Sequence, residues 1–355
     1  MEAGEVFGRR LHAARKRAGL SQRALAGRVG LSAMAISKYE QGRMLPGSER
    51  LIALAEALGV PVEYLLRPDP VSVTAIAWRS HPRVPARARD AAVSLVADWV
   101  ERYRELEQLL GEQLPGDAAA GVVPGHVGDP ERAAQSLRAG WGLGEEPIPS
   151  LVDLLEEHGV RVGFLPLPAG VDAMSFRVEG GEPCVVVRPD VPGDRQRFSL
   201  AHELAHLAWP GERPAEAFHR FARAFLVPAE AARRELGRRR ERLCLEELQL
   251  LKARWGFSIA GWLHRAEDLG LVGPREIARW RRLFREKGWN RHEPGPAVPP
   301  ERPDRFTLLL LRAVSEGLIN RRRASELAGM PYDEFVEFVR RSAFPGGPAG
   351  ATVPA

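Results

Sequence analysis

The 355-residue sequence predicts a mainly helical protein with one small β-sheet, an α+β fold divided among several domains. Apolar residues recur at helical spacing along most of the chain. Three short apolar runs, bounded by Pro and Gly, follow one another between residues 160 and 188 and predict strands. Two stretches rich in Pro, 68–85 and 291–303, predict linkers between domains.

The composition is that of a globular protein, with 45% hydrophobic and 27% charged residues. No apolar run is long enough to span a bilayer, and the N-terminus has no signal-peptide pattern. The two cysteines, Cys184 and Cys244, do not form a disulfide framework. We therefore expect a cytoplasmic protein without a membrane partner.

Residues 1–67 predict a compact bundle of short helices. Ser21 is placed to cap a helix that runs through Val29, Gly30 suits a left-handed turn, and Ser32 is placed to cap a helix over 33–40. Residues 1–50 also carry ten Lys or Arg against four acidic residues, although the whole chain has a net charge of only +5. This basic segment predicts a polyanionic partner.

Three short sequences within this bundle, Leu20-Ser-Gln-Arg-Ala-Leu-Ala26, Val29-Gly-Leu-Ser32 and Ile36-Ser-Lys-Tyr-Glu-Gln-Gly42, resemble the lambda-repressor-like (Xre) helix-turn-helix domain. The resemblance implies a homodimer that binds a double-stranded DNA operator, with the second helix of the pair in the major groove. The residues expected to contact DNA are Gln22, Arg23, Ala33, Met34, Ser37, Lys38 and Arg43.

The residues at the start of the predicted recognition helix limit direct base readout. Ala33 and Met34 can contact thymine methyl groups but cannot form bidentate hydrogen bonds with a base. Sequence specificity is therefore expected to depend on Gln22, Ser37 and Lys38, on dimer spacing, or on DNA shape. The alternative is a small helical docking domain that no longer binds DNA.

Residues 86–290 predict a central α+β domain. Within the first linker, 68–85, Val71–Ala77 alternates in the manner of a strand. The elements expected further along are a long amphipathic helix over 86–111, helices over 130–139 and 149–158, strands over 160–165, 173–178 and 184–188, a helix from near Arg195, a helix over 216–227, and mostly helical structure over 229–286.

The most informative motif of the chain is His202-Glu203-x-x-His206. Residues four apart share a helix face, so both imidazoles can reach one zinc ion, and Glu203 can act as a general base. A lone match of this kind also occurs by chance on surface helices. Here Phe198 and Leu207 surround the motif with apolar residues, and a buried imidazole pair without a ligand would be costly.

Two neighbouring segments, Arg197-Phe-Ser-Leu-Ala-His-Glu-Leu-Ala-His206 and Phe218-His-Arg-Phe-Ala-Arg-Ala-Phe-Leu-Val-Pro228, resemble the ImmA/IrrE family of zinc metallopeptidases. The likeness extends over about 75–290, through Lys252–Ile259 and Arg265–Gly270. It implies a zincin-like central domain with Zn²⁺ held by His202 and His206. Glu203 would take a proton from zinc-bound water and pass it to the leaving amine.

The sequence departs from the family pattern at the third zinc ligand. The family usually has Glu at the position occupied here by Ala215, and Glu216 lies one residue later, a rotation of about 100° on a helix. We expect Glu216 to be the ligand. His219 and Glu212 are alternatives, and the site could also be incomplete. An acidic residue is in any case favourable near a helix N-terminus.

The sequence as a whole predicts a DNA-binding transcription regulator with a fused zinc endopeptidase-like domain that cleaves a protein partner or senses a signal. The resemblance implies regulation of stress, phage or toxin–antitoxin genes, with a protein substrate or toxin as the partner. A non-catalytic regulator or antitoxin with a degenerate peptidase fold is the alternative. A protease whose N-terminal domain only docks substrate is a third interpretation. Residues 304–343 predict a C-terminal helical segment and 344–355 a disordered tail.

Overall fold

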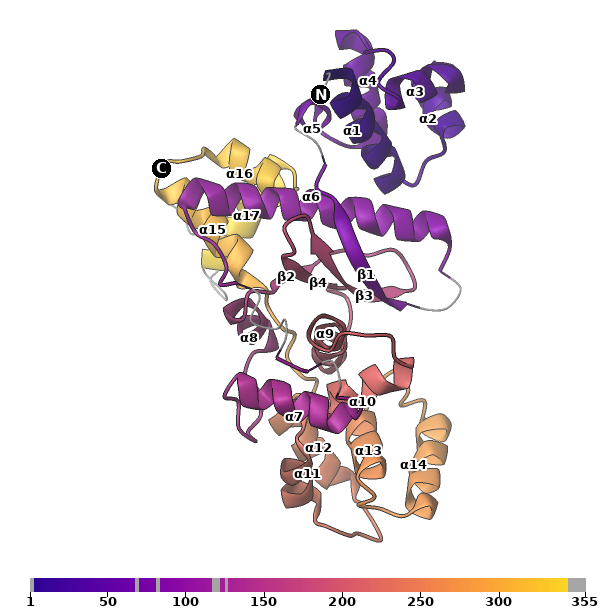
Figure 1. Cartoon of the computed structure of the whole chain (residues 1–355), viewed down its shortest axis with the longest axis vertical. Coiled ribbons are helices and arrows are strands. Elements are labelled where there is room, and N and C mark those ends of the chain that lie inside the picture. Colours follow the sequence, from indigo (N-terminus) through magenta and orange to yellow (C-terminus); the bar gives the residue numbers. More distant parts are fainter. Residues whose placement is uncertain (1–2, 68–69, 81–83, 117–121, 125–126, 344–355) are drawn as a thin grey trace. The chain divides into compact units, whose positions relative to one another are not determined.

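In the computed structural model, the chain forms two compact units (Figure 1). The first consists of Met1–Val96 and Leu114–Arg302, and the second of Ala97–Gln113 and Pro303–Ala355. The described residues are 3–67, 70–80, 84–116, 122–124 and 127–343. They confirm the predicted fold class, because helices predominate and one small sheet is present. The predicted disordered tail, 344–355, lies outside the described residues.

The N-terminal helices begin and end where the capping residues place them. The Ser21 side chain accepts a hydrogen bond from the backbone N–H of Ala24, and the Ser32 side chain does the same for Ala35. Gly30 has a φ of 64°, the left-handed conformation that the turn requires. The five helices are α1 (Ala3–Arg17), α2 (Gln22–Arg28), α3 (Ala33–Glu40), α4 (Ser48–Leu58) and α5 (Val62–Leu66), packed around their own apolar core.

The sheet contains the three predicted strands and a fourth from the predicted linker. The strands are β1 (Val73–Ser80), β2 (Arg161–Phe164), β3 (Val171–Val178) and β4 (Pro183–Val187), in the order β1-β3-β4-β2. β3 pairs antiparallel with both β1 and β4, and β2 pairs parallel with β4. The alternation in Val71–Ala77 therefore does mark a strand, and β1 forms one edge of the sheet.

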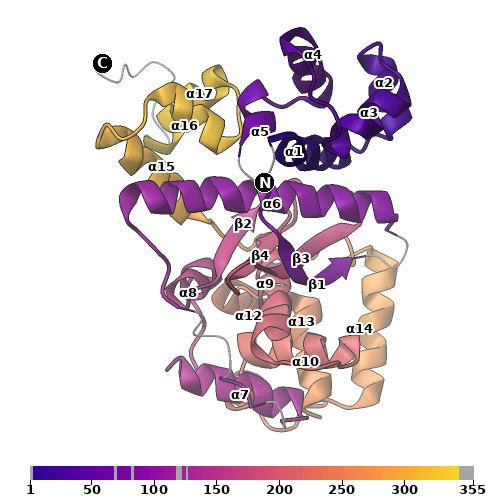
Figure 2. The ribbon, with the colours of Figure 1, turned by 45° about the horizontal axis from the view of Figure 1, so that its top comes forward.

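Helices account for the rest of the first unit. They are the first part of α6 (Ala86–Leu110), α7 (Pro130–Gly140), α8 (Leu151–Glu157), α9 (Gly193–Ala208), α10 (Ala215–Leu226), α11 (Ala229–Leu236), α12 (Leu245–Trp255), α13 (Ile259–Asp268) and α14 (Pro274–Lys287). Helix α9, which carries the His-Glu-x-x-His motif, contacts three strands and α10 (Figures 1 and 2). Because α9 is packed on both sides, most of its residues are buried, including polar ones.

One buried carboxylate connects α9 to α8. Arg197 of α9 donates a hydrogen bond to Glu301 and another, of 2.6 Å, to the carbonyl of Ile148. Glu301 also accepts hydrogen bonds of 3.0 and 3.1 Å from the backbone N–H groups of Leu151 and Val152, at the start of α8. The carboxylate thus neutralises a buried guanidinium and satisfies a helix N-terminus.

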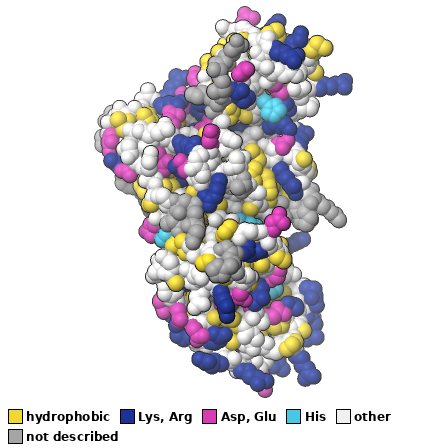
Figure 3. Space-filling view, in the orientation of Figure 1, with side chains coloured by type: hydrophobic (Ala, Val, Ile, Leu, Met, Phe, Trp, Pro, Cys, Tyr) yellow, Lys and Arg dark blue, Asp and Glu magenta, His cyan; other side chains and the backbone are white. Residues whose placement is uncertain are grey.

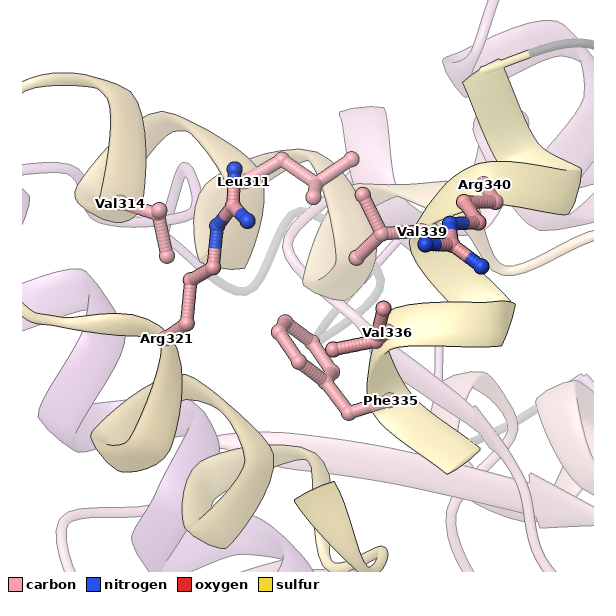
Figure 4. Close-up of a pocket in the computed structure, with 7 residues that line it drawn as sticks. All are labelled: Leu311, Val314, Arg321, Phe335, Val336, Val339 and Arg340. Carbon is pink, nitrogen blue, oxygen red and sulfur yellow. The ribbon is translucent and has the colours of Figure 1, made fainter. Parts of the chain in front are cut away.

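The second unit consists of the end of α6 with α15 (Asp304–Ser315), α16 (Arg321–Ala328) and α17 (Tyr332–Ala343). Arg102 donates a 2.8 Å hydrogen bond to the carbonyl of Leu327, and Arg305 forms a 2.7 Å ion pair with Glu107. A pocket of about 160 Å³ within this unit is lined by Leu311, Val314, Arg321, Phe335, Val336, Val339 and Arg340 (Figure 4). No helix among the described residues has the length and apolar character needed to cross a membrane.

The Arg197–Glu301 interaction leads to a prediction about stability. We expect Glu301→Ala to lower the free energy of unfolding by about 3 kcal/mol, because the Arg197 guanidinium would stay buried without its partner. Urea denaturation of the full-length protein measures the change. Glu157→Ala, at an exposed position, is the control and should cost less than about 0.5 kcal/mol. Equal stability of the two variants would contradict the role given to Glu301.

Candidate functional site

Helix α9 places His202 and His206 side by side, facing α10. The centroids of the two imidazole rings are 5.1 Å apart. Both rings also contact Phe218 of α10, at centroid distances of 6.2 Å for His202 and 3.9 Å for His206. The spacing of four residues therefore produces the shared face that the sequence predicts.

A third imidazole joins this pair from α10. The ring centroid of His219 lies 4.8 Å from that of His202 and 6.0 Å from that of Phe198. The His219 side chain is 36% exposed, whereas the whole of residue His202 is only 5% exposed. Three histidines from two helices thus lie close together where α9 packs against α10.

The surroundings of these histidines favour neutral imidazole. Burial lowers the pKa of His202 to about 2, with further contributions from His206, His219 and Arg79. Burial and the neighbouring His219 lower the pKa of His206 to about 4. Burial also lowers the pKa of His219. All three rings are therefore neutral at pH 7, the protonation state in which an imidazole can bind a metal ion.

Glu203 is fully buried on the side of α9 that faces the sheet. Its Oε2 accepts a 2.6 Å hydrogen bond from the hydroxyl of Ser175 on β3, while its Oε1 is buried without a hydrogen-bond partner. Burial raises the pKa of Glu203 to about 7, although the Ser175 hydrogen bond and the charge of Arg79 oppose the shift. A carboxyl with this pKa can both accept and release a proton near neutral pH.

Arg79 of the edge strand β1 brings a positive charge to the same region. Its guanidinium donates a hydrogen bond to the Ser199 hydroxyl and lies 5.0 Å from the centre of the Phe198 ring. Burial lowers the pKa of Arg79, against the influence of Asp172 and Glu203. The sequence analysis missed Arg79 and Ser175, because neither is near the motif in sequence. The alternation around Arg79 was the one signal that could have placed it on the sheet.

The predicted third ligand, Glu216, lies on the exposed side of α10. Its side chain is 65% exposed, and its carboxylate pairs with Arg223 at 2.6 Å and with the Nδ1 of His219 at 3.5 Å. Glu212 is also exposed, on the loop before α10. In the part of the chain that the structure describes, no three His, Cys, Asp or Glu side chains already form a group that could hold a metal ion. Assignment of the third ligand therefore stays a prediction.

The helix-turn-helix surface is accessible. Lys and Arg side chains are exposed on the N-terminal helices in Figure 3. Met34 at the start of α3 is 69% exposed, and Ser37 is half-buried and accepts a 3.2 Å hydrogen bond from Gln41. The remaining predicted contacts on this surface, Arg23, Ala33, Lys38 and Arg43, are all exposed. Their arrangement is compatible with DNA binding, which itself stays a prediction.

A buried carboxylate holds Gln22 in place at the start of α2. Glu40 accepts hydrogen bonds from Arg15, at 2.5 and 2.8 Å, and from Gln22, at 2.8 Å, and it lies 3.2 Å from the ring nitrogen of His12. Burial alone would raise the pKa of Glu40, but the hydrogen bonds from Arg15, His12 and Gln22 lower it to about 2. The network links α1, α2 and α3, and the sequence analysis did not identify it.

Comparisons with known proteins cover two separate segments of the chain. Residues 11–65 match the helix-turn-helix family model, and residues 155–267 match the model of the IrrE N-terminal-like domain. Repressor protein C2 of Salmonella phage P22 is 36% identical over 99 residues, which are 27% of this chain and 44% of that protein. An uncharacterized transcriptional regulator in the ATPase CF(0) region of Rhodospirillum rubrum is 46% identical over 55 residues, 14% of this chain and 51% of that protein. The chain thus spans about half the length of these relatives.

Among solved structures, the apo form of ComR from S. thermophilus aligns with 95% of this chain and 94% of its own chain. The identity is 13% and the TM-score 0.18. The apo form of the competence regulator ComR from Streptococcus vestibularis gives the same identity and TM-score.

The Glu40 network leads to a prediction about pH. The pKa of Glu40 is lower in the folded protein than in the unfolded chain, so its contribution to stability is complete above about pH 4.5 and is lost as the pH falls towards about 2. We expect Glu40→Gln to cost about 2–3 kcal/mol at pH 7 and much less at pH 3. Urea unfolding at both pH values tests this, with the exposed Glu49→Gln as control. A cost for Glu40→Gln that does not change with pH would contradict the prediction.

Proposed function

From a chain that joins an Xre-like helix-turn-helix domain to an IrrE N-terminal-like domain, we infer a DNA-binding transcription regulator with a zinc-dependent endopeptidase-like central domain. The central domain acts on a protein partner or senses a signal. The observation that carries this proposal is the arrangement on α9, where two buried or half-buried imidazoles lie side by side and a buried carboxylate follows the first of them.

DNA binding is supported by the exposed surface of α2 and α3. In helix-turn-helix proteins the N-terminal residues of the second helix contact bases, and this position is occupied here by the exposed Ala33 and Met34. Lys38 lies further along the same helix, and Arg23 and Arg43 flank it as candidates for phosphate contacts. The operator is double-stranded DNA, bound by a homodimer. The similarity to a phage repressor agrees with this function.

The residues of the central site fit a zinc ion. Neutral imidazoles are among the donors that zinc prefers, and His202 and His206 supply two of them. The Nδ1 atom of His202 and the Oε1 atom of Glu203 are buried without hydrogen-bond partners, as expected where an ion and its ligands would complete the site. Bound zinc would polarise the scissile carbonyl of a peptide and activate water for attack.

The protein's own side chains then have distinct roles. Glu203 takes up the proton of the attacking water and delivers it to the leaving amine, for which a pKa near 7 is suitable. Ser175 holds one Glu203 oxygen and leaves the other available. Arg79 supplies a positive charge beside the carboxylate and can stabilise negative charge that develops on the substrate.

A second function, that of a non-catalytic regulator or antitoxin, is favoured by one observation. Glu216 is exposed and paired with Arg223, so no carboxylate from the start of α10 completes the site as it stands. In this case the central domain would serve as a platform for a ligand or a toxin partner. Zinc content distinguishes the two functions, because only the peptidase needs the ion.

Proteolysis should depend on Glu203. We expect Glu203→Gln to keep its zinc but to lower cleavage at least about a hundred-fold, because the proton-accepting group is removed. New protein N-termini, measured by mass spectrometry in cells that express either the wild type or the variant, provide the test. His264→Ala, which removes an exposed histidine outside the site, should cleave like the wild type. Identical new N-termini with and without Glu203 would rule out catalysis by this site.

DNA binding should depend on the basic residues of the helix-turn-helix surface. We expect Lys38→Ala and Arg43→Ala each to weaken binding to the protein's own promoter region. Each lost phosphate contact should also reduce the slope of affinity against salt concentration by about one. Electrophoretic mobility shifts at several salt concentrations measure both effects. Arg285→Ala, which removes the same charge from α14, is the control. Salt-independent binding, or none, would contradict a DNA-binding role.

A further inference from the structure

The proposed zinc site needs one more protein ligand than the His202–His206 pair provides. Catalytic zinc sites commonly use three protein donors and keep the fourth position open. Since no three described side chains are already gathered as a metal site, a third one has to turn towards the pair. The donors near the start of α10 are Glu212, Glu216 and His219. The inference about which of them binds rests on the proposed function.

The angular positions of these residues around α10 indicate which of them faces His202 and His206. The helix is regular from Ala215 to Leu226, so His219 lies one turn after Ala215 and Glu216 lies about 100° away from it. The rings of α10 that contact the two α9 histidines belong to Phe218 and His219. The face of α10 that contacts His202 and His206 therefore carries the imidazole of His219.

His219 is close enough to bind and has room to move. Its ring centroid lies 4.8 Å from that of His202, and the two rings are inclined by 37°. With 36% of its side chain exposed, the ring can turn without displacing the core. A change of side-chain rotamer is the movement that would bring a ring nitrogen of His219 closer to the His202–His206 pair.

The surroundings of Glu216 suit a supporting role. Its carboxylate accepts a 2.6 Å hydrogen bond from Arg223, which is itself held by Asp268 at 2.6 Å. The other Glu216 oxygen lies 3.5 Å from Nδ1 of His219. Histidines that bind metals commonly donate their second N–H to a carboxylate, which fixes the tautomer and the ring orientation. Glu216 can do this for His219 and leave Nε2 for the ion.

We propose that His219 is the third protein ligand of the zinc ion and that Glu216 orients it through Nδ1. His202, His206 and His219 would then hold the ion with three neutral imidazoles and keep both of its positive charges, whereas two imidazoles and a carboxylate would keep one. This charge strengthens the attraction of the site for a carbonyl oxygen or another electron-rich group. The absence of Glu at position 215 would then be compensated by His219, which lies one turn later on the same helix.

Zinc affinity separates the two candidates. Metal-free full-length protein is titrated with Zn²⁺ in competition with a chromophoric chelator. We expect His219→Ala and His202→Ala each to weaken binding on the order of a hundred-fold or more, because each removes a ligand. Glu216→Gln should weaken it by about ten-fold, the lower range for a supporting partner. Circular dichroism confirms that each variant is folded.

A cysteine in place of each candidate gives a direct test of contact with the metal. We expect Co²⁺-loaded His219→Cys to show a thiolate-to-cobalt charge-transfer band that Co²⁺-loaded Glu216→Cys lacks, since only a coordinated thiolate gives this band. The band in Glu216→Cys alone, or wild-type affinity in His219→Ala, would overturn the assignment and leave the zinc site standing. Absence of zinc binding by the wild type would overturn both the site and the proposed peptidase.

Discussion

The burial of α9 between the sheet and α10 is the constraint on which the central domain depends. A helix in this position is expected to be apolar, yet α9 buries Arg197, Ser199, His202 and Glu203. Such groups are stable in the interior only with partners. Arg197 has Glu301 and backbone carbonyls, Ser199 bonds to the carbonyl of its own helix, and one Glu203 oxygen has a hydroxyl of β3. Among these residues, the buried atoms without a hydrogen-bond partner are Nε of Arg197, Nδ1 of His202 and Oε1 of Glu203, and the last two belong to the residues of the proposed chemistry.

In the helix-turn-helix domain, too, a buried polar group is stabilised by partners from other helices. Glu40 is a buried carboxylate that three side chains from α1 and α2 satisfy, and one of them, Gln22, belongs to the predicted DNA-contacting set. The network therefore both stabilises the domain and holds Gln22 in place on the surface predicted to contact DNA. In both domains, a buried acid is satisfied from more than one element: Glu301 bonds to α9 and α8, and Glu40 bonds to α1 and α2.

Local signals in the sequence predicted much of this structure. Ser21, Gly30 and Ser32 determine the ends of short helices through contacts within a few residues, and the structure confirms them. The α+β class, the Xre-like domain and the IrrE-like domain are also confirmed. The partnerships of Glu301 and Glu40 were not predicted. They join residues distant in the chain, and no local pattern indicates which buried charges meet.

The spacing of residues in the sequence was not sufficient to identify the third zinc ligand. A shift of one residue turns a helical side chain by about 100°, so the sequence could not decide between Glu216 and His219. Anomalous diffraction at the zinc edge, from crystals of the zinc-loaded full-length protein, tests most directly whether His202 and His206 hold a metal ion. We predict one peak within bonding distance of both imidazoles. An empty position there, with zinc elsewhere or absent, would contradict the metal site.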